Sequence, residues 1–174
     1  PGFSEQPEGR GSSGVPPVGE TQRLVVRCGL LPVGEIRMWT EWACNDRDEA
    51  HIALRARVRS NRALSAIFSL DGFFESCMGP DGFESSRATW TCTEGRKTRA
   101  EWLSFDRAAG VVRRAVSDRP PLADVPLRDG LRDLGAAIWW FRSELARGTP
   151  PAQLRVAVGR DVVEIVPGLR GEES

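Results

Sequence analysis

Between positions 24 and 116 the apolar residues mostly recur at every second position, which is the spacing of strands that bury one face. The clearest alternation runs over residues 51–59. There an apolar set alternates with a mostly cationic set: Ile52, Leu54, Ala56 and Val58 against His51, Arg55, Arg57 and Arg59. We expect the apolar set to face the protein interior and the cationic set to face solvent.

Short turns separate the strand-like runs, which cover about residues 24–30, 36–44, 51–59, 68–78, 83–93, 98–105 and 111–116. The turns are rich in Gly, Pro, Asp and Asn. They fall at 32–34, 45–49, 80–82, 94–96 and 106–110. Turns this short join antiparallel neighbours, because parallel strands need a crossover of about a dozen or more residues. The pattern therefore predicts an antiparallel meander, with a bulge near Asp71–Gly72 and a proline-rich loop over 117–129.

A helical spacing replaces the alternation over residues 131–145. Its apolar stripe recurs at intervals of three, four and seven, and comprises Leu131, Leu134, Ile138, Phe141 and Leu145. Either Asp129 or Asp133 is the expected N-cap, and Gly148 is the expected glycine just beyond the C-terminus. Two more strand-like runs follow the helix, at 154–158 and 162–166.

The chain has six tryptophans and no tyrosine. Trp139 and Trp140 lie well off the helical stripe, so we expect a curled sheet or a long loop to cover them. Large aromatic side chains can also line a cavity for an apolar ligand. The candidates are Trp42, Trp90, Trp102, Trp139 and Trp140. The alternative is that these side chains simply fill the core.

The charge is balanced, with 24 basic and 24 acidic residues and a pI near 7.1. Nucleic-acid-binding domains normally carry a basic surplus, so no nucleic-acid partner is predicted. No apolar run approaches the ~20 residues of a membrane-spanning helix. Residues 1–20 are rich in Pro, Gly, Ser and Glu and are expected to form a disordered leader or linker. A single domain at 21–168 and a disordered tail at 169–174 complete the expected organisation.

Little in the chain suggests catalysis. His51 is the only histidine, so nearly every triad-type mechanism would have to use it, and its place on a cationic strand face favours a solvated side chain. The oxygen-rich segment 45–49 could hold calcium, but Arg47 and the lack of a following glycine favour a plain acidic turn. No phosphate-binding or nucleophile motif occurs. We therefore predict no enzyme, no metal and no cofactor.

Two structural points remain open at this level. The four cysteines could form one or more disulfides, or they could stay reduced as small apolar residues: Cys28, Cys44, Cys77 and Cys92. Arg142 lies at the edge of the helical stripe and should need a carboxylate partner. Asp71 and Asp106 are the candidates for this structural ion pair, which we favour over an anion-binding role for Arg142.

Four segments carry a family resemblance. The helix matches a motif that typically reads Asp-Pro-Leu-Ser-Ala-Leu-Tyr-Tyr-Leu-Arg, through Asp133, Ala137, Trp139, Trp140 and Arg142, with Leu134 in place of the proline. Three other segments agree in order and spacing: Val33-Gly34-Glu35, Phe68-Ser-Leu-Asp71 with Phe74-Glu75-Ser76, and Phe105-Asp106. Over about residues 23–166 the chain thus resembles the exported bacterial domain-of-unknown-function family 3108. The resemblance implies an exported, mostly β domain and supplies no catalytic residues.

These observations predict a mostly β fold, in which a curled antiparallel sheet forms an open barrel or half-shell with one helix packed on its concave side. The outline is similar to that of periplasmic lipoprotein-carrier domains, a likeness of fold only. We expect a non-enzymatic protein of the bacterial envelope or periplasm. Its concave face would bind a lipid, another apolar ligand or an envelope protein. The alternative is a structural or assembly protein whose interior the helix plugs, with no ligand.

Overall fold

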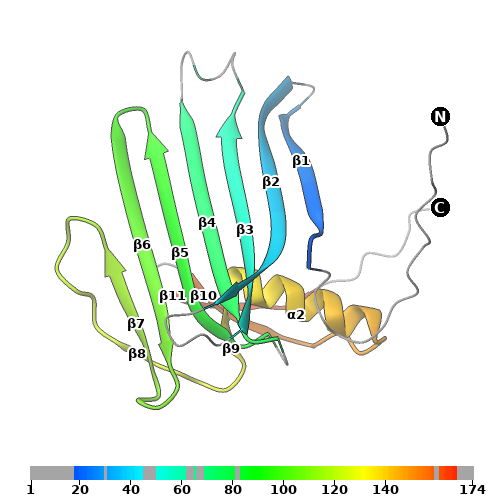
Figure 1. The fold of residues 1–174 in the computed structure, drawn as a ribbon, viewed down its shortest axis with the longest axis vertical. Helices are drawn as coiled ribbons and strands as arrows, with labels where there is room; N and C mark the ends of the chain where they lie inside the picture. The colour runs from blue at the N-terminus through cyan, green and yellow to red at the C-terminus, as the bar shows by residue number, and fades with distance from the viewer. Residues whose placement is uncertain are drawn as a thin grey trace.

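The computed structural model describes residues 18–29, 31–44, 50–61, 65, 69–80, 83–158 and 161–167. In this part of the chain one large antiparallel sheet contains eight strands that follow one another in chain order. They are β1 (Thr21–Cys28), β2 (Leu31–Cys44), β3 (Ala50–Ser60), β4 (Leu70–Met78), β5 (Ser85–Glu94), β6 (Lys97–Asp106), β7 (Val111–Val116) and β8 (Val125–Pro126). Figure 1 shows this sheet as an open meander with β1 and β8 at opposite edges. The predicted antiparallel, mostly β fold with one main helix is confirmed.

A second, smaller sheet was not predicted. It consists of β9 (Leu131–Asp133), β10 (Leu154–Val158) and β11 (Asp161–Ile165), with β10 in the middle. The β9 and β10 strands are parallel. They can be so because α2 (Leu134–Ala146) forms the crossover between them, as parallel neighbours require. The sequence pattern alone did not reveal this pairing, because β9 is only three residues long and reads as the first turn of the helix.

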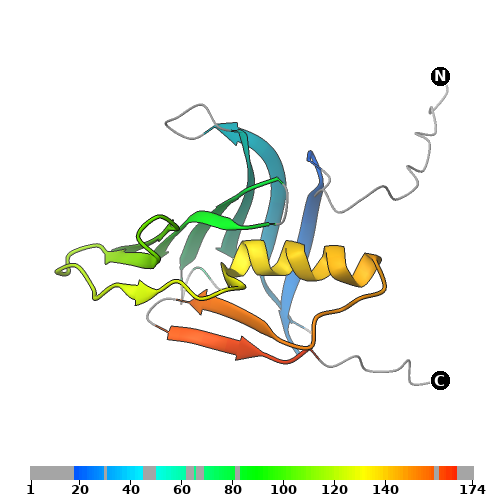
Figure 2. The ribbon, with the colours of Figure 1, turned by 90° about the horizontal axis from the view of Figure 1, so that it is seen from below.

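The helix lies between the two sheets. Figure 2 shows α2 with the large sheet on one side and β10 and β11 on the other. One side of α2 packs into a core cluster with the large sheet through Ala136 and Trp139. Another side packs on β10 through Ala137, Trp140 and Phe141. Strands therefore flank this helix on two sides, and the expected cover over Trp139 and Trp140 comes from strands of both sheets.

The strand register places two rows of side chains on the face of the large sheet that looks toward the helix. One row of directly opposed residues crosses six strands through Thr40, Leu54, Ser76, Ala88, Leu103 and Arg114. The next row crosses the same strands through Met38, Ala56, Phe74, Trp90, Glu101 and Val116. Both rows point the same way because alternate residues share one face of a strand. We call this side the inner face.

The outer face of the sheet carries the cationic set predicted for β3, and acidic neighbours neutralise it. Arg55 pairs with Glu75 of β4 at 2.7 Å and also contacts Glu41 of β2. Arg57 and Arg59 both pair with Asp71, at 2.9 and 3.3 Å. Hydrogen bonds and charge from these two arginines hold the pKa of Asp71 below its usual value. The alternation along β3 therefore resolves into a buried apolar face and an ion-paired outer face.

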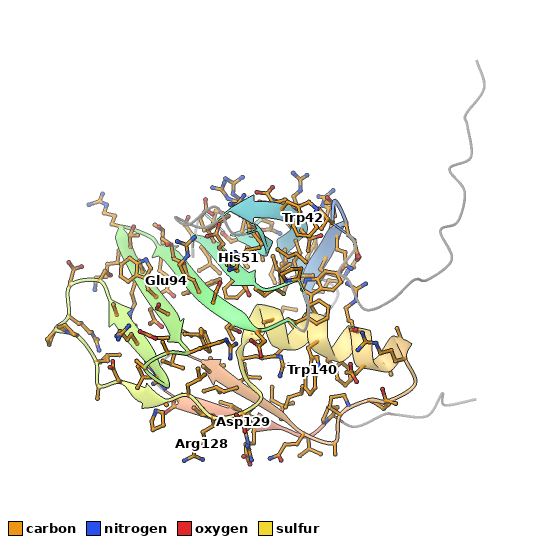
Figure 3. All side chains as sticks on the ribbon, turned by 60° about the horizontal axis from the view of Figure 1, so that its bottom comes forward. Trp42, His51, Glu94, Arg128, Asp129 and Trp140 are labelled. Atoms are coloured by element: carbon orange, nitrogen blue, oxygen red, sulfur yellow. The ribbon has the colours of Figure 1, made fainter. Side chains whose placement is uncertain are left out.

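The caps of α2 agree with the sequence, but its buried face does not. Asp133 is the N-cap, whereas Asp129 lies exposed before β9 (Figure 3). Gly148 follows the helix with a φ of +76°. The predicted apolar stripe is largely exposed, since Leu134, Ile138 and Leu145 retain 43%, 42% and 44% of their accessible surface. The small residues decide the packing, because they let the helix backbone approach β4 closely.

Gly135 shows how close that approach is. A Cβ atom added at Gly135 would lie 2.5 Å from the Cβ of Ser76 and 3.0 Å from the Phe74 ring. The first distance is shorter than real Cβ contacts, and the second is tighter than most of them. The helix is therefore oriented by its glycine and alanines, which sit against the sheet. As a consequence, Leu134, Ile138 and Leu145 point away from the packed contact with β4.

Three local predictions are wrong in position. The first hairpin turns at Gly29, whose φ is +59°, and residues 32–34 belong to β2. The β4–β5 register shifts between Cys77 and Met78, where Ser86 of β5 is the extra residue, while pairing through Gly72 is regular. A side chain at Gly72 would collide with the Trp90 ring at 2.9 Å, so this glycine makes room for an indole. The predicted loop after β7 contains β8, which pairs with β7.

Some predictions fall outside the described residues. These are the leader up to residue 17, the acidic turn at 45–49 and the tail from residue 168. Residue Gly19 is described, and its N–H donates to the carbonyl of Thr40 at 2.8 Å. Among the described helices, none has both the length and the apolar character needed to cross a membrane.

Candidate functional site: an apolar cavity between sheet and helix

A cavity of about 480 Å³ lies between the inner face of the large sheet and the start of α2. Its volume is within the ~300–1,000 Å³ typical of small-molecule sites. Both rows of the inner face contribute to its wall, and the lining is mostly apolar. From β2, β3 and β4 come Met38, Leu54, Ala56, Val58 and Phe74. The wall continues on β5, β6 and β7 with Ala88, Trp90, Leu103 and Val116.

The helix supplies the opposite wall through Leu134 and Ile138. These are the same residues that the sequence pattern assigned to the buried stripe. They are directed at the cavity rather than at packed neighbours, which explains why both stay about two-fifths exposed. The predicted stripe therefore does form an apolar surface, but no described residue covers its Leu134 and Ile138 side chains.

The five tryptophans proposed as a cavity lining do not gather in one place. Trp90 lies in the cavity wall, in tilted contact with Phe74 at 6.4 Å between ring centroids. Trp102 also borders the cavity, although alternation along β6 places its side chain on the face opposite to Leu103. Trp42 is 54% exposed near the end of β2, far from Trp140 in Figure 3.

The two helix tryptophans take structural positions. Trp139 is 6% exposed and lies in the main core cluster with Ile52, Leu54 and Met78. Trp140 packs between this cluster and β10, and the Arg132 guanidinium lies 4.1 Å above its ring. Trp139 is thus buried and Trp140 is partly buried, in line with the expectation that these two side chains are covered. They belong to the core that fixes α2, outside the cavity wall.

Arg142 is ion-paired, but with a carboxylate that the sequence did not suggest. Its guanidinium contacts Glu20, just before β1, at 3.2 Å and stacks on the Trp139 ring at 4.1 Å. The predicted partners are engaged elsewhere: Asp71 with Arg57 on the outer face, and Asp106 with Arg113 at 2.6 Å. The sheet itself separates Asp71 from the helix, so that pairing cannot form.

Three ionisable side chains border the cavity, and the sequence reasoning missed all of them as site residues. Glu101 pairs with Arg99 at 3.4 Å. Arg114 is only 7% exposed, and burial lowers the pKa of its guanidinium while the charge of Asp161 opposes the shift. The signal for Arg114 was present, because alternation between Val112 and Val116 puts residue 114 on the apolar face.

Asp133 is the third of these groups, and one of its carboxylate oxygens caps the helix. Its carboxylate accepts hydrogen bonds from the N–H groups of Gly135 at 2.8 Å and Ala136 at 3.2 Å. Its own N–H donates to Ser85 Oγ at 2.8 Å. Burial raises the pKa of this carboxyl, although the hydrogen bonds to the helix start oppose the shift. Asp133 therefore fixes the edge of the cavity where α2 begins.

The histidine and the three described cysteines are not part of the cavity lining. His51 is on the outer face, since Ile52 points inward. Cys28, Cys77 and Cys92 are free thiols, so no disulfide joins these three, and the side chain of Cys44 lies outside the described residues. Burial raises the pKa of the Cys77 thiol, which disfavours a nucleophilic thiolate.

The comparisons with known proteins add one result. No curated protein and no solved structure matches the chain. A family model, described as protein of unknown function (DUF3108), matches residues 23–174. This match spans both sheets, α2 and the cavity between them, and it includes the segments whose order and spacing suggested the resemblance. The chain therefore belongs to the domain-of-unknown-function family 3108.

Proposed function

We propose that this protein is a non-enzymatic envelope or periplasmic protein that binds an apolar ligand in the cavity between its large sheet and α2. The observation that carries the proposal is the pair Leu134 and Ile138. Both lie on a well-packed helix and both face an open, apolar cavity of about 480 Å³. An export role rests on the resemblance to an exported family, and the mostly apolar lining among the described residues supports a binding role.

The energetics favour occupancy by an apolar group. Removing apolar surface from water is worth roughly 25 cal/mol per Å², and fully burying a Leu or Ile side chain about 1.5–3 kcal/mol. Leu134 and Ile138 leave about two-fifths of that surface uncovered. Trp90 and Phe74 face them from the sheet. A flexible hydrocarbon chain would contact both walls at once and recover this energy without any specific polar contact.

A structural role without a ligand is the second candidate, and one observation favours it. Trp139 and Ala136 fill part of the interior completely, together with Ile52 and Met78. If the cavity closed further in solution, the helix would act as a plug and the inner face would have no ligand.

Native mass spectrometry, with lipid extraction of the purified protein, separates the two functions. Ligand binding predicts a bound apolar molecule, and Ile138→Trp should fill the cavity and reduce its retention by about 10-fold or more. Leu145→Trp is the matched control, because Leu145 lies on the same helix with similar exposure but outside the cavity. Thermal melting should show both variants folded.

The outcomes are distinct. Retention by the wild type and by Leu145→Trp, together with loss in Ile138→Trp, supports the binding function. Absence of any bound molecule, in the extracts and after addition of dodecanoate or dodecanol, would favour the plugged structural protein. Equal retention by both tryptophan variants would place the ligand elsewhere on the molecule.

A further inference from the structure

The cavity wall changes character from one edge to the other. On β2, β3 and β4 the wall is purely apolar, formed by side chains such as Met38, Ala56 and Val58. On β6 and β7 it contains the charged groups Glu101 and Arg114. Register places Arg114 directly opposite Leu103, in the same row as Leu54 on the far side. A ligand lying along this row would meet hydrocarbon at one end and ionic groups at the other.

Arg114 is the more unusual of the two charges. Its residue is 7% exposed and sits among apolar neighbours, including Val112 and Val116 on the same strand. An arginine stays protonated in proteins, so its positive charge persists in this setting. The guanidinium has five N–H donors in a fixed fork that suits a carboxylate or phosphate. A further anion can therefore bind beside the contacts that Arg114 already makes within the chain.

The acidic groups of the cavity are less available to a ligand. Glu101 is ion-paired with Arg99. Asp133 accepts from the first N–H groups of α2, and its charge is offset by the positive end of that helix. A cationic head group would have to compete with these contacts. An anionic head group at Arg114 would share the guanidinium with the negative charge of Asp161. The five N–H donors of the guanidinium leave room for a second anion, so the cavity favours a negative head group over a positive one.

From this arrangement we infer that the ligand is a single-chain amphiphile with an anionic carboxylate or phosphate head group. The hydrocarbon chain lies between the inner face and Ile138, toward β2 and β3, and the head group lies against Arg114 at the β6–β7 side. The inference rests on the proposed function, because it assigns the orientation and the charge of the molecule that the cavity holds.

Four ligands of equal chain length test it with the full chain: dodecanoate, dodecyl phosphate, dodecanol and dodecyltrimethylammonium. Binding is measured by isothermal titration below the micelle concentration, and inorganic phosphate is titrated alone. We expect at least one of the two anions to bind about 10-fold tighter than dodecanol, as a charge-assisted bidentate contact allows. Arg114→Met should abolish this preference. Arg113→Met is the matched control, since Arg113 is on the outer face and pairs with Asp106.

Each result decides a separate point. Equal binding of all four ligands overturns the charge preference and leaves the apolar binding function standing. If dodecyltrimethylammonium binds most tightly, the preference for an anion is wrong, and the carboxylate of Glu101 would then be the group that binds the head group. Tight binding of inorganic phosphate alone overturns the amphiphile, because the site would then recognise the anion without a chain. Binding of none of the four removes the proposed function itself. The wild-type ranking decides the matter even if Arg114→Met fails to fold.

Discussion

Two faces of the same helix have opposite relations to the sheet. The face formed by Gly135, Ala136 and Trp139 packs so closely on β4 that no added methyl group fits at Gly135. The face formed by Leu134 and Ile138 is the more hydrophobic in sequence, yet it borders a cavity. The contrast shows that in this helix close backbone approach selects the packed face, and the larger aliphatic side chains are left to line the site.

The largest effect should come from truncating neighbouring residues on the two faces. Trp139→Ala should lower the free energy of unfolding by about 3–5 kcal/mol, because it empties the middle of the core. Ile138→Ala should cost under about 1 kcal/mol, since its side chain borders open space. Urea denaturation measures both. Similar losses for the two variants would mean that the faces are equally packed and that no cavity exists in solution.

A smaller effect should follow from adding a methyl group to the packed face of the helix. Gly135→Ala should destabilise the protein by about 1–3 kcal/mol, because its Cβ would collide with that of Ser76. Ser76→Gly in the same chain should recover much of the loss, since the obstructing side chain is removed. A gain in stability from Gly135→Ala alone, as helix propensity would give, would show that α2 sits farther from β4.

The smallest effect concerns the start of the helix, between the two faces. Burial raises the pKa of Asp133, so the folded state favours its protonated form. The stability from this group is fully present below its ordinary pKa of about 3.9 and is lost as pH rises through the raised value. Asp133→Asn keeps the cap but cannot ionise. Its stability relative to the wild type should therefore increase as pH rises above about 4.

Thermal melts of both proteins between pH 4 and 8 measure that difference directly. A constant difference across this range would contradict a raised pKa. A loss of stability for Asp133→Asn that grows with pH would mean that the ionised carboxylate, and not its neutral form, is preferred at the helix start.

The large sheet could be predicted from sequence because its signal is local. Alternation along β3 and turn residues such as Gly95 and Gly110, both with positive φ, define strands and hairpins within a few residues. The same is true of the Asp133 cap. The β9–β10 pairing could not be predicted, since it joins residues more than twenty positions apart and β9 has only three residues.

The site was only partly predictable. The family motif and the excess of tryptophan pointed to α2 and to an enclosed interior, but helical periodicity assigned the wrong face to the core. Helical periodicity gives every apolar residue the same weight. It does not show that the face with Gly135 can approach β4 most closely, because this glycine has no side chain to collide with Ser76. Arg114 was not singled out from the sequence, although its place between Val112 and Val116 put it on the apolar face of its strand. Its partner strands, which show it to be inward, are known only from the register.

The parallel pairing of β9 with β10 has a mechanical consequence. Because α2 continues directly from β9 and packs on β10 through Ala137, Trp140 and Phe141, its start and its middle are tied to the small sheet. The helix cannot slide along the large sheet by itself. Any widening of the space in front of Trp90 must move the helix and its two strands together as one rigid βαβ block, so the width of that space is set by how this block docks.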